Sequence, residues 1–225
     1  MSLSWGNYPH LEPKATVTPS WTSELAILPS AFLPHGCGRS YGDSCLSRDA
    51  LLQTTRLNRF IAFDREHGIL RAEAGITFAE ILNVIVPAGW FLPVTPGTKF
   101  VTLGGAIAND VHGKNHHIAG TIGCHVRSFE LIRSTGERFT CSPTEKSDFF
   151  RATIGGLGLT GVISWAEIQL IRIPGPGIKQ ETIPFGSLKD FFALTQESDS
   201  NAPYTVAWLQ TTKTGSGIGG LFYRG

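Results

Sequence analysis

Apolar and polar residues alternate along several short segments of the chain, with the two-residue period of a half-buried β-strand. The clearest case is Ile69–Ala74 (ILRAEA), which follows a turn at Glu66-His67-Gly68. In Thr160–Ile173 alternate residues likewise share one side, and further segments that read as strands are Ala50–Thr54, Phe60–Phe63, Val126–Ile132, Arg138–Cys141, Tyr204–Thr211 and Ile218–Tyr223. The pair that flanks residues 134–137 (STGE) is typical of a β-hairpin.

A helical period begins after Thr77. Thr77 can cap the helix, and Glu80 stands three residues later, as in a capping box. Pro87-Ala88-Gly89 should end the helix. Its apolar positions share one face, which we expect to pack in the core: Phe78, Ile81, Leu82 and Ile85. Further helices are predicted at Lys146–Ala152 and, capped by Ser187, at Leu188–Gln196.

The segment Pro96–His125 follows neither period cleanly. It holds six glycines and four histidines among recurring apolar residues. Glycine disfavours a helix, so we expect irregular backbone that approaches a ligand closely. A second glycine-rich loop, Pro34–Asp43 (PHGCGRSYGD), follows an apolar segment at Glu24–Leu33 that should lead a strand into it. Two such loops can bind one phosphate-bearing ligand through main-chain N–H groups.

Short mixed strands, few helices and no regular βαβ repeat favour an α+β fold over a dinucleotide-binding parallel sheet. Pro174-Gly-Pro-Gly177 is a clear break in the pattern. We therefore predict an extended N-terminal arm at residues 1–22, a main domain at 23–174 and the beginning of a second domain at 175–225.

Composition narrows the class of partner. The 225 residues carry a net charge of +1, which gives no electrostatic reason to expect nucleic acid or an acidic membrane as partner. Four scattered cysteines without a CxxC pattern indicate free thiols and a reducing, cytoplasmic location. The chain shows neither a signal peptide nor an apolar run long enough for a membrane span.

Four motifs occur in a specific order: GCGRSYGD at 36–43, PGT at 96–98, TLGGAIANDVHGKNHH at 102–117 and GGLGLTG at 155–161. This combination resembles the flavin domain of the vanillyl-alcohol-oxidase (PCMH-type) flavoproteins. The resemblance implies FAD as cofactor, held between two α+β subdomains, and a substrate domain that covers the flavin. Members of this family run to about twice this length, so the chain resembles a truncated member, with FAD binding but little turnover expected.

The resemblance also implies the residues that contact FAD. They are Gly36, Cys37, Gly38, Arg39, Ser40, Tyr41 and Gly42 in the first loop, Gly97, Thr98, Thr102, Leu103, Gly104, Gly105, Ala108, Asn109, Val111, His112 and Gly113 in the second, and Gly161, Val162 and Ile163 beyond them.

Arg39 bears on how FAD is attached. Relatives that bind FAD covalently carry histidine at this position of the motif, and arginine cannot act as that nucleophile. We therefore expect non-covalent FAD. A salt bridge from Arg39 to Asp43 or Glu73 is an alternative role, compatible with the first.

His112 and Lys114 are the candidate catalytic residues. By resemblance they lie beside the flavin, where Lys114 can stabilise developing negative charge or an anionic substrate group. A solvated loop lysine is the alternative. His112, His116, His117 and Asp110 also suggest a metal, but Gly113 argues against the helix that would align them, so no metal is predicted.

These residues support three hypotheses. The first is an FAD-dependent oxidoreductase that transfers a hydride from a secondary alcohol of a sugar or polyprenyl-phosphate-linked pentose to flavin N5. Oxygen or a quinone would then accept electrons, a reductase partner could complete an epimerisation, and the whole protein could associate with a membrane. The second is a non-catalytic nucleotide-binding module. The third is an oxidase of free alditols or sugar lactones.

Overall fold

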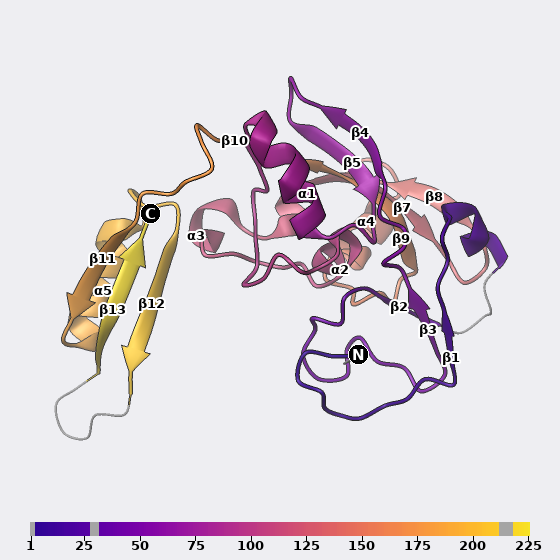
Figure 1. The fold of residues 1–225 in the computed structure, drawn as a ribbon, viewed down its shortest axis with the longest axis horizontal. Helices are drawn as coiled ribbons and strands as arrows, with labels where there is room; N and C mark the ends of the chain where they lie inside the picture. The colour runs from indigo at the N-terminus through magenta and orange to yellow at the C-terminus, as the bar shows by residue number, and fades with distance from the viewer. Residues whose placement is uncertain (1–2, 28–31, 212–217) are drawn as a thin grey trace.

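The structure is a computed structural model that describes residues 3–27, 32–211 and 218–225. Its centre is a five-stranded antiparallel sheet in the order β4-β5-β9-β7-β8 (Figure 1). The strands are β4 (Phe60–Asp64), β5 (Ile69–Glu73), β9 (Val162–Gln169), β7 (Val126–Ile132) and β8 (Arg138–Cys141). The sequence therefore predicted each strand of this sheet, and alternation marked β5 and β9 among them.

The main core lies between this sheet and three helices, α1 (Phe78–Ile85), α2 (Leu103–Ala108) and α4 (Ser147–Thr153). From the sheet, Leu70, Ala166 and Ile168 are completely buried. Phe129 on β7 stacks on Phe150 of α4, with ring centroids 5.3 Å apart. Burial of the apolar side chains in this core is the main stabilising contribution to the fold.

Helix α1 begins with the predicted capping box. The Glu80 N–H donates to Thr77 Oγ1 at 3.2 Å, and the Thr77 N–H donates to Glu80 Oε2 at 2.8 Å. A 3-10 turn (Val86–Ala88) follows and ends at Gly89, whose φ of 80° lies in the left-handed region. The apolar face is buried as expected: Phe78, Ile81 and Ile85 are each fully buried, and Leu82 packs against the same core.

A small parallel sheet lies beside the first glycine loop. It contains β1 (Ala15–Val17), β3 (Ala50–Gln53) and β2 (Leu33–His35), in the order β1-β3-β2. The predicted arm thus includes a paired strand. Within the expected apolar segment at 24–33, a 3-10 helix covers Thr22–Ile27, and residues 28–31 lie outside the described residues.

The C-terminal part forms a sheet of its own in the order β11-β13-β12, drawn in orange to yellow in Figure 1. The strands are β11 (Glu181–Phe185), β12 (Thr205–Gln210) and β13 (Gly219–Arg224), and α5 (Leu188–Ser198) packs on one face. Phe191 of α5 contacts Phe185 and Phe222, with centroid separations of 5.7 and 6.2 Å. The sequence pattern did not reveal β11, whose fourth residue is Pro184.

Two expectations need correction. The glycine-rich segment does contain a helix, α2, because Thr102 caps it: its Oγ1 accepts from the Gly105 N–H at 3.1 Å. The predicted long strand at Thr160–Ile173 is two strands, separated at Leu170, whose N–H donates to Gly68 O. There β9 ends, and β10 (Ile171–Arg172) pairs with β6 (Trp90–Phe91) instead.

The fold class is α+β, as predicted, with separate sheets and only short helices (Figure 1). No helix within the described ranges has the length and apolar character that a membrane crossing requires. The stretch between β10 and β11 coincides with the proline-glycine break, but the domain boundary at 174–175 remains a prediction.

Candidate functional site

A cavity of about 640 Å³ opens where the first glycine loop, α2 and β9 meet. This volume is in the range of cavities that bind cofactors and other small molecules. The parallel sheet supplies one side, through the loop after β2 and Thr54 after β3, and the five-stranded sheet supplies Ile163 from β9. The cavity therefore lies between the two N-terminal sheets.

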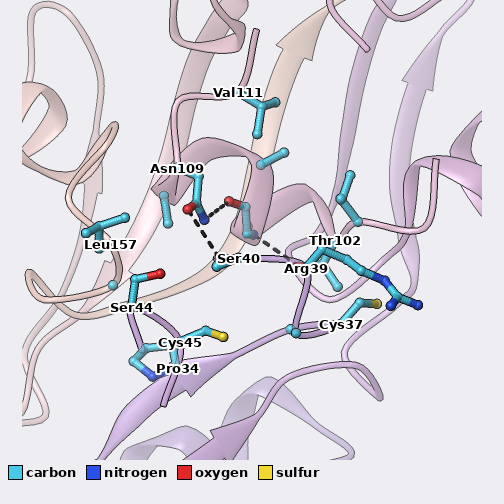
Figure 2. A pocket seen from close by; sticks show the side chains of 18 of the residues that line it. Pro34, Cys37, Arg39, Ser40, Ser44, Cys45, Thr102, Asn109, Val111 and Leu157 are labelled. Carbon is cyan, nitrogen blue, oxygen red and sulfur yellow. Dashed lines mark hydrogen bonds between the residues drawn. The ribbon is translucent and has the colours of Figure 1, made fainter. Parts of the chain in front are cut away.

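The two glycine-rich segments are in direct contact. A Cβ atom on Gly36 would lie 2.4 Å from Thr102 Oγ1, so only glycine permits this approach. Ser40 Oγ donates to Asn109 Oδ1 at 3.3 Å, which ties the first loop to the end of α2. Figure 2 shows Ser40 and Asn109 facing each other at the cavity. The loops thus converge on one space, as the glycine pattern suggested.

Main-chain donors differ between the first loop and the first turn of α2. The N–H groups of Cys37, Gly38 and Arg39 donate no hydrogen bond within the described part of the chain. In the first turn of α2 the donors are used: Leu103 N–H bonds Ile76 O at 2.8 Å, and Gly104 N–H bonds Ala74 O at 2.7 Å. The first loop is therefore the better source of N–H groups for a phosphate.

Arg39 dominates the electrostatics of the cavity. Among the described residues that line it, Arg39 alone carries a permanent charge, and none is an aspartate or glutamate. Its Nε donates to Phe100 O at 3.4 Å. The alternative salt bridge to Glu73 is not formed, because Glu73 pairs with Arg59 at 3.2 Å. A cavity with this charge balance suits an anionic ligand.

Two thiols line the same cavity. Burial raises the pKa of Cys37 above its ordinary value, and the nearby Arg39 guanidinium opposes this only in part. Burial also raises the pKa of Cys45, whose Sγ donates to Leu3 O at 3.3 Å. Because a thiol is a weak nucleophile until it ionises, both cysteines fit a packing role better than a reactive one.

Most of the residues expected to contact the cofactor line this cavity. From the first loop these are Gly36, Cys37, Gly38, Arg39, Ser40 and Tyr41, and from the remaining segments they are Gly97, Thr98, Thr102, Gly104, Gly105, Ala108, Asn109, Val111, His112, Gly161 and Ile163.

Four of the expected contacts lie elsewhere, for local reasons. Leu103 and Val162 are buried in apolar clusters of the core. Gly113 is enclosed by protein, since a Cβ there would meet Thr95 O at 2.8 Å. Gly42, with φ of 58°, serves the turn that ends the loop.

Sequence reasoning missed several lining residues, including Trp5, Thr54, Ala74 and Leu157. Thr54 and Ala74 follow β3 and β5, so their place at strand ends was the available signal. Leu157 has a positive φ of 54° within a turn rich in glycine. Trp5 belongs to an arm without periodicity and offered no signal.

The candidate catalytic residues lie toward the C-terminal sheet. His112 lines the cavity and is exposed, whereas Lys114 is exposed outside the lining set. The main chain of this segment is fixed, because Lys114 O accepts from the Thr205 N–H at 3.0 Å. The His112 and His116 rings lie 6.0 Å apart. Among the described residues, no group of three or more ligand-type side chains is arranged to hold a metal.

The residues of the cavity fit a bound dinucleotide. Gly97 lines the space, and a Cβ atom on it would meet no protein atom within 4 Å, so the room beside it is open. Unused N–H groups, one guanidinium and a glycine-lined wall are the features that diphosphate binding requires. Residues 28–142 match the family described as FAD binding domain.

The chain belongs to this FAD binding domain family, within the vanillyl-alcohol-oxidase flavoproteins. FAD is therefore its cofactor.

Three curated proteins illustrate what this chain is similar to. The chain is 38% identical over 180 residues to decaprenylphosphoryl-beta-D-ribose oxidase of Mycolicibacterium smegmatis, an alignment that covers 79% of this chain and 39% of the relative. It is 30% identical to L-gulonolactone oxidase of Scyliorhinus torazame, covering 60% of this chain and 31% of that one. For a protein named putative D-arabinono-1,4-lactone oxidase of Neurospora crassa, the identity is 29%, covering 62% and 24%.

The chain therefore spans two fifths or less of the length of these FAD binding domain relatives. Residues 28–142 include both glycine-rich segments and most of the residues that line the cavity, whereas Trp5 and the lining residues from Thr153 to Ile163 lie outside this range.

Proposed function

We propose that this chain binds FAD non-covalently and forms the cofactor-binding part of an oxidoreductase that acts on the CH–OH group of a sugar or lipid-linked sugar. The observation that carries the proposal is the contact between the two glycine-rich segments, Gly36 against Thr102, around a cavity that holds unused N–H groups. Membership in the FAD binding domain family supports it.

The residues assigned to the cofactor divide into two tasks. The N–H groups of Cys37, Gly38 and Arg39 would hold the diphosphate, with the Arg39 guanidinium adding positive charge. Ala108, Asn109 and Val111, at the end of α2, would lie along the ring system. Arginine at position 39 supports the non-covalent mode, since its side chain is protonated at any physiological pH.

Bound FAD would supply a hydride acceptor, the chemistry that oxidation of an alcohol to a ketone requires. On the protein side, His112 lies at the cavity. Its imidazole can accept a hydrogen bond from the substrate hydroxyl or donate one to it. Lys114 lies two residues on, and its ammonium group can attract an anionic substrate group. The Thr205-to-Lys114 main-chain bond holds this segment in place.

We propose a sugar-type secondary alcohol as substrate, and among these a polyprenyl-phosphate-linked pentose. Similarity to the Mycolicibacterium protein supports the lipid-linked pentose, whereas similarity to the two lactone oxidases supports free sugar lactones. Residues 23–174 would then be the FAD domain, and 175–225 would begin the substrate domain. Oxygen or a quinone would accept the electrons, and a reductase could complete an epimerisation.

Titration with FAD tests the cofactor assignment. The protein is expected to bind FAD and become yellow, and acid precipitation should release the flavin to the supernatant. Flavin that stays with the precipitated protein would overturn the non-covalent mode. Absence of any FAD binding by folded protein would overturn the proposed function.

Anaerobic mixing with candidate substrates tests the reaction. The FAD-loaded protein is combined separately with a polyprenyl-phosphate pentose, a free alditol and a sugar lactone, and bleaching of the visible flavin absorbance is followed. Bleaching by the lipid-linked pentose alone supports the proposed substrate. Bleaching by the lactone or alditol alone favours the oxidase of free sugars. Bound FAD that none of them bleaches contradicts the reaction for this chain alone and leaves the cofactor assignment standing.

A further inference from the structure

The N-terminal arm is docked on the first glycine loop. The Trp5 N–H donates to Ser40 O at 3.1 Å, and Cys45 Sγ donates to Leu3 O at 3.3 Å. A Cβ atom on Gly38 would lie 2.7 Å from Leu3 O, so the loop and the arm pass each other at a distance that only glycine allows. Ser4, between them, is 2% exposed. The arm is therefore an integral part of the loop structure.

This docking brings an aromatic side chain to the cavity. Trp5 is one of the residues that line it, yet 53% of its surface remains exposed. The Arg39 guanidinium lies over the indole at 5.6 Å from the ring centroid, within the range of a cation–π contact. Trp5 and Arg39 thus form one wall, which carries an aromatic face and a positive charge.

An exposed indole beside a cavity needs a physical account, because large aromatic side chains are stabilised by burial. The main-chain bond to Ser40 would hold the arm with any residue other than proline at position 5, so it does not explain the indole. A planar conjugated ring in the cavity would cover part of the exposed face. Stacking of such rings on aromatic side chains contributes to nucleotide binding in other proteins.

We propose that residues 3–5 form a wall of the cofactor site, in which Trp5 packs its indole against a planar ring of bound FAD beside Arg39. This inference rests on the proposed function, since it requires that the cavity binds FAD. It extends the cofactor site to a segment that precedes residue 28, where the family match begins.

The test compares two tryptophans. Trp21 is also exposed, at 58%, and also lies under an arginine, with Arg59 3.8 Å from its ring centroid, but it is not part of the cavity wall. Trp5→Ala is expected to raise the Kd for FAD about tenfold, whereas Trp21→Ala should leave it within about twofold of the parent. Circular dichroism of both variants checks that the fold is retained.

Tryptophan fluorescence gives a readout that does not depend on the alanine variant. FAD should quench the emission of the five-tryptophan parent, and Trp5→Phe should remove part of that quenching while keeping most of the affinity. Titration with ADP and with riboflavin shows which ring of FAD is covered. Loss of affinity for ADP in Trp5→Ala indicates the adenine, and loss for riboflavin indicates the flavin.

The outcomes separate this inference from the proposed function. If the parent binds FAD while Trp5→Ala binds it equally well and Trp5→Phe is quenched to the same extent, the wall assignment is wrong and the cofactor assignment stands. If the parent binds no FAD, the proposed function fails first. Should Trp5→Ala not fold, the Trp5→Phe quenching and its affinity decide the question.

Discussion

The N-terminal and C-terminal sheets of this chain are built from similar strands but differ in how much core they support. The five-stranded sheet buries a continuous cluster that includes α1, α2 and α4. In the C-terminal region the buried apolar side chains among the described residues are Phe185, Ala202 and Phe222, and Trp208 and Leu221 remain exposed. Because burial of apolar area drives folding, the first region should be much the more stable.

The two regions also differ in where their glycines and aromatic side chains lie. Near the cavity, glycine allows close contact between segments, as at Gly36, and the aromatic side chains of Phe129 and Phe150 are in the core. In the C-terminal sheet, Trp208 and Leu221 pair across neighbouring strands on the face away from the buried Phe222. The N-terminal region therefore has a continuous core beside the cavity, whereas the C-terminal sheet is covered on one face only.

The largest effect is expected in the main core. Phe129→Ala removes a fully buried ring that stacks on Phe150, and should lower the free energy of unfolding by about 3–5 kcal/mol. Urea denaturation followed by circular dichroism measures this loss. FAD binding should weaken with it, because β7 pairs with the strand β9 that carries Ile163. A loss below about 1 kcal/mol would show that the core is not continuous.

Phe222→Ala should act more locally. Its ring is 2% exposed and packs on Phe191, so truncation is expected to cost about 3 kcal/mol within the C-terminal sheet. Hydrogen exchange should speed up in residues 205–210 and 219–224 and stay unchanged in 126–132. FAD affinity should remain within about twofold of the parent. Equal acceleration in both sheets would mean that the two regions unfold as one unit.

Gly97→Ala should change FAD affinity without changing the stability of the fold. A Cβ at this position meets no protein atom within 4 Å, so the melting temperature should not change. The added methyl group would enter space that bound FAD needs, and the Kd is expected to rise about tenfold. Gly175→Ala is the matched control, since it also meets nothing within 4 Å but lies outside the cavity wall. Similar affinities for both variants would place FAD away from Gly97.

The smallest effects come from two helix caps. Thr77 caps α1, and Ser187 caps α5 by accepting from the Asp190 N–H at 3.1 Å. Replacing either with alanine should cost about 1 kcal/mol. The global unfolding midpoint should fall for Thr77→Ala, whereas Ser187→Ala should change exchange only within α5. A fall of the global midpoint in both variants would argue against separate stability.

Sequence patterns predicted the strands of the five-stranded sheet and helix α1 but missed α2 and β11, for physical reasons. Ile69–Glu73 and Val126–Ile132 are strands because one face of each contacts the core, and that leaves an alternating signature. Helix α2 was missed because glycine lowers helix propensity. Here a Cβ atom on Gly104 would lie 2.9 Å from Ala74 Cβ, so close packing requires the glycine, and the Thr102 cap offsets part of its cost. Tertiary contact overrode local preference.

The cavity-lining residues in the glycine-rich motifs could be predicted from the sequence, whereas those in the N-terminal arm could not. The loop at 36–41 and the α2 segment were recognised by their glycines, and they do line one cavity. Trp5 was not recognised, because its position depends on hydrogen bonds to Ser40 and on the space left by Gly38, which no periodicity records.

The main-chain bond from Thr205 to Lys114 has a mechanical consequence. A second polar contact, from His117 Nε2 to Ala202 O at 3.3 Å, joins the same two segments. The rim that carries His112 and Lys114 is thus tethered to β12, so any displacement of the C-terminal sheet would pull on that rim before it reached the glycine loops. Movement of the C-terminal sheet would then change the opening beside His112 and Lys114 while leaving the glycine loops, and the cofactor contacts they make, in place.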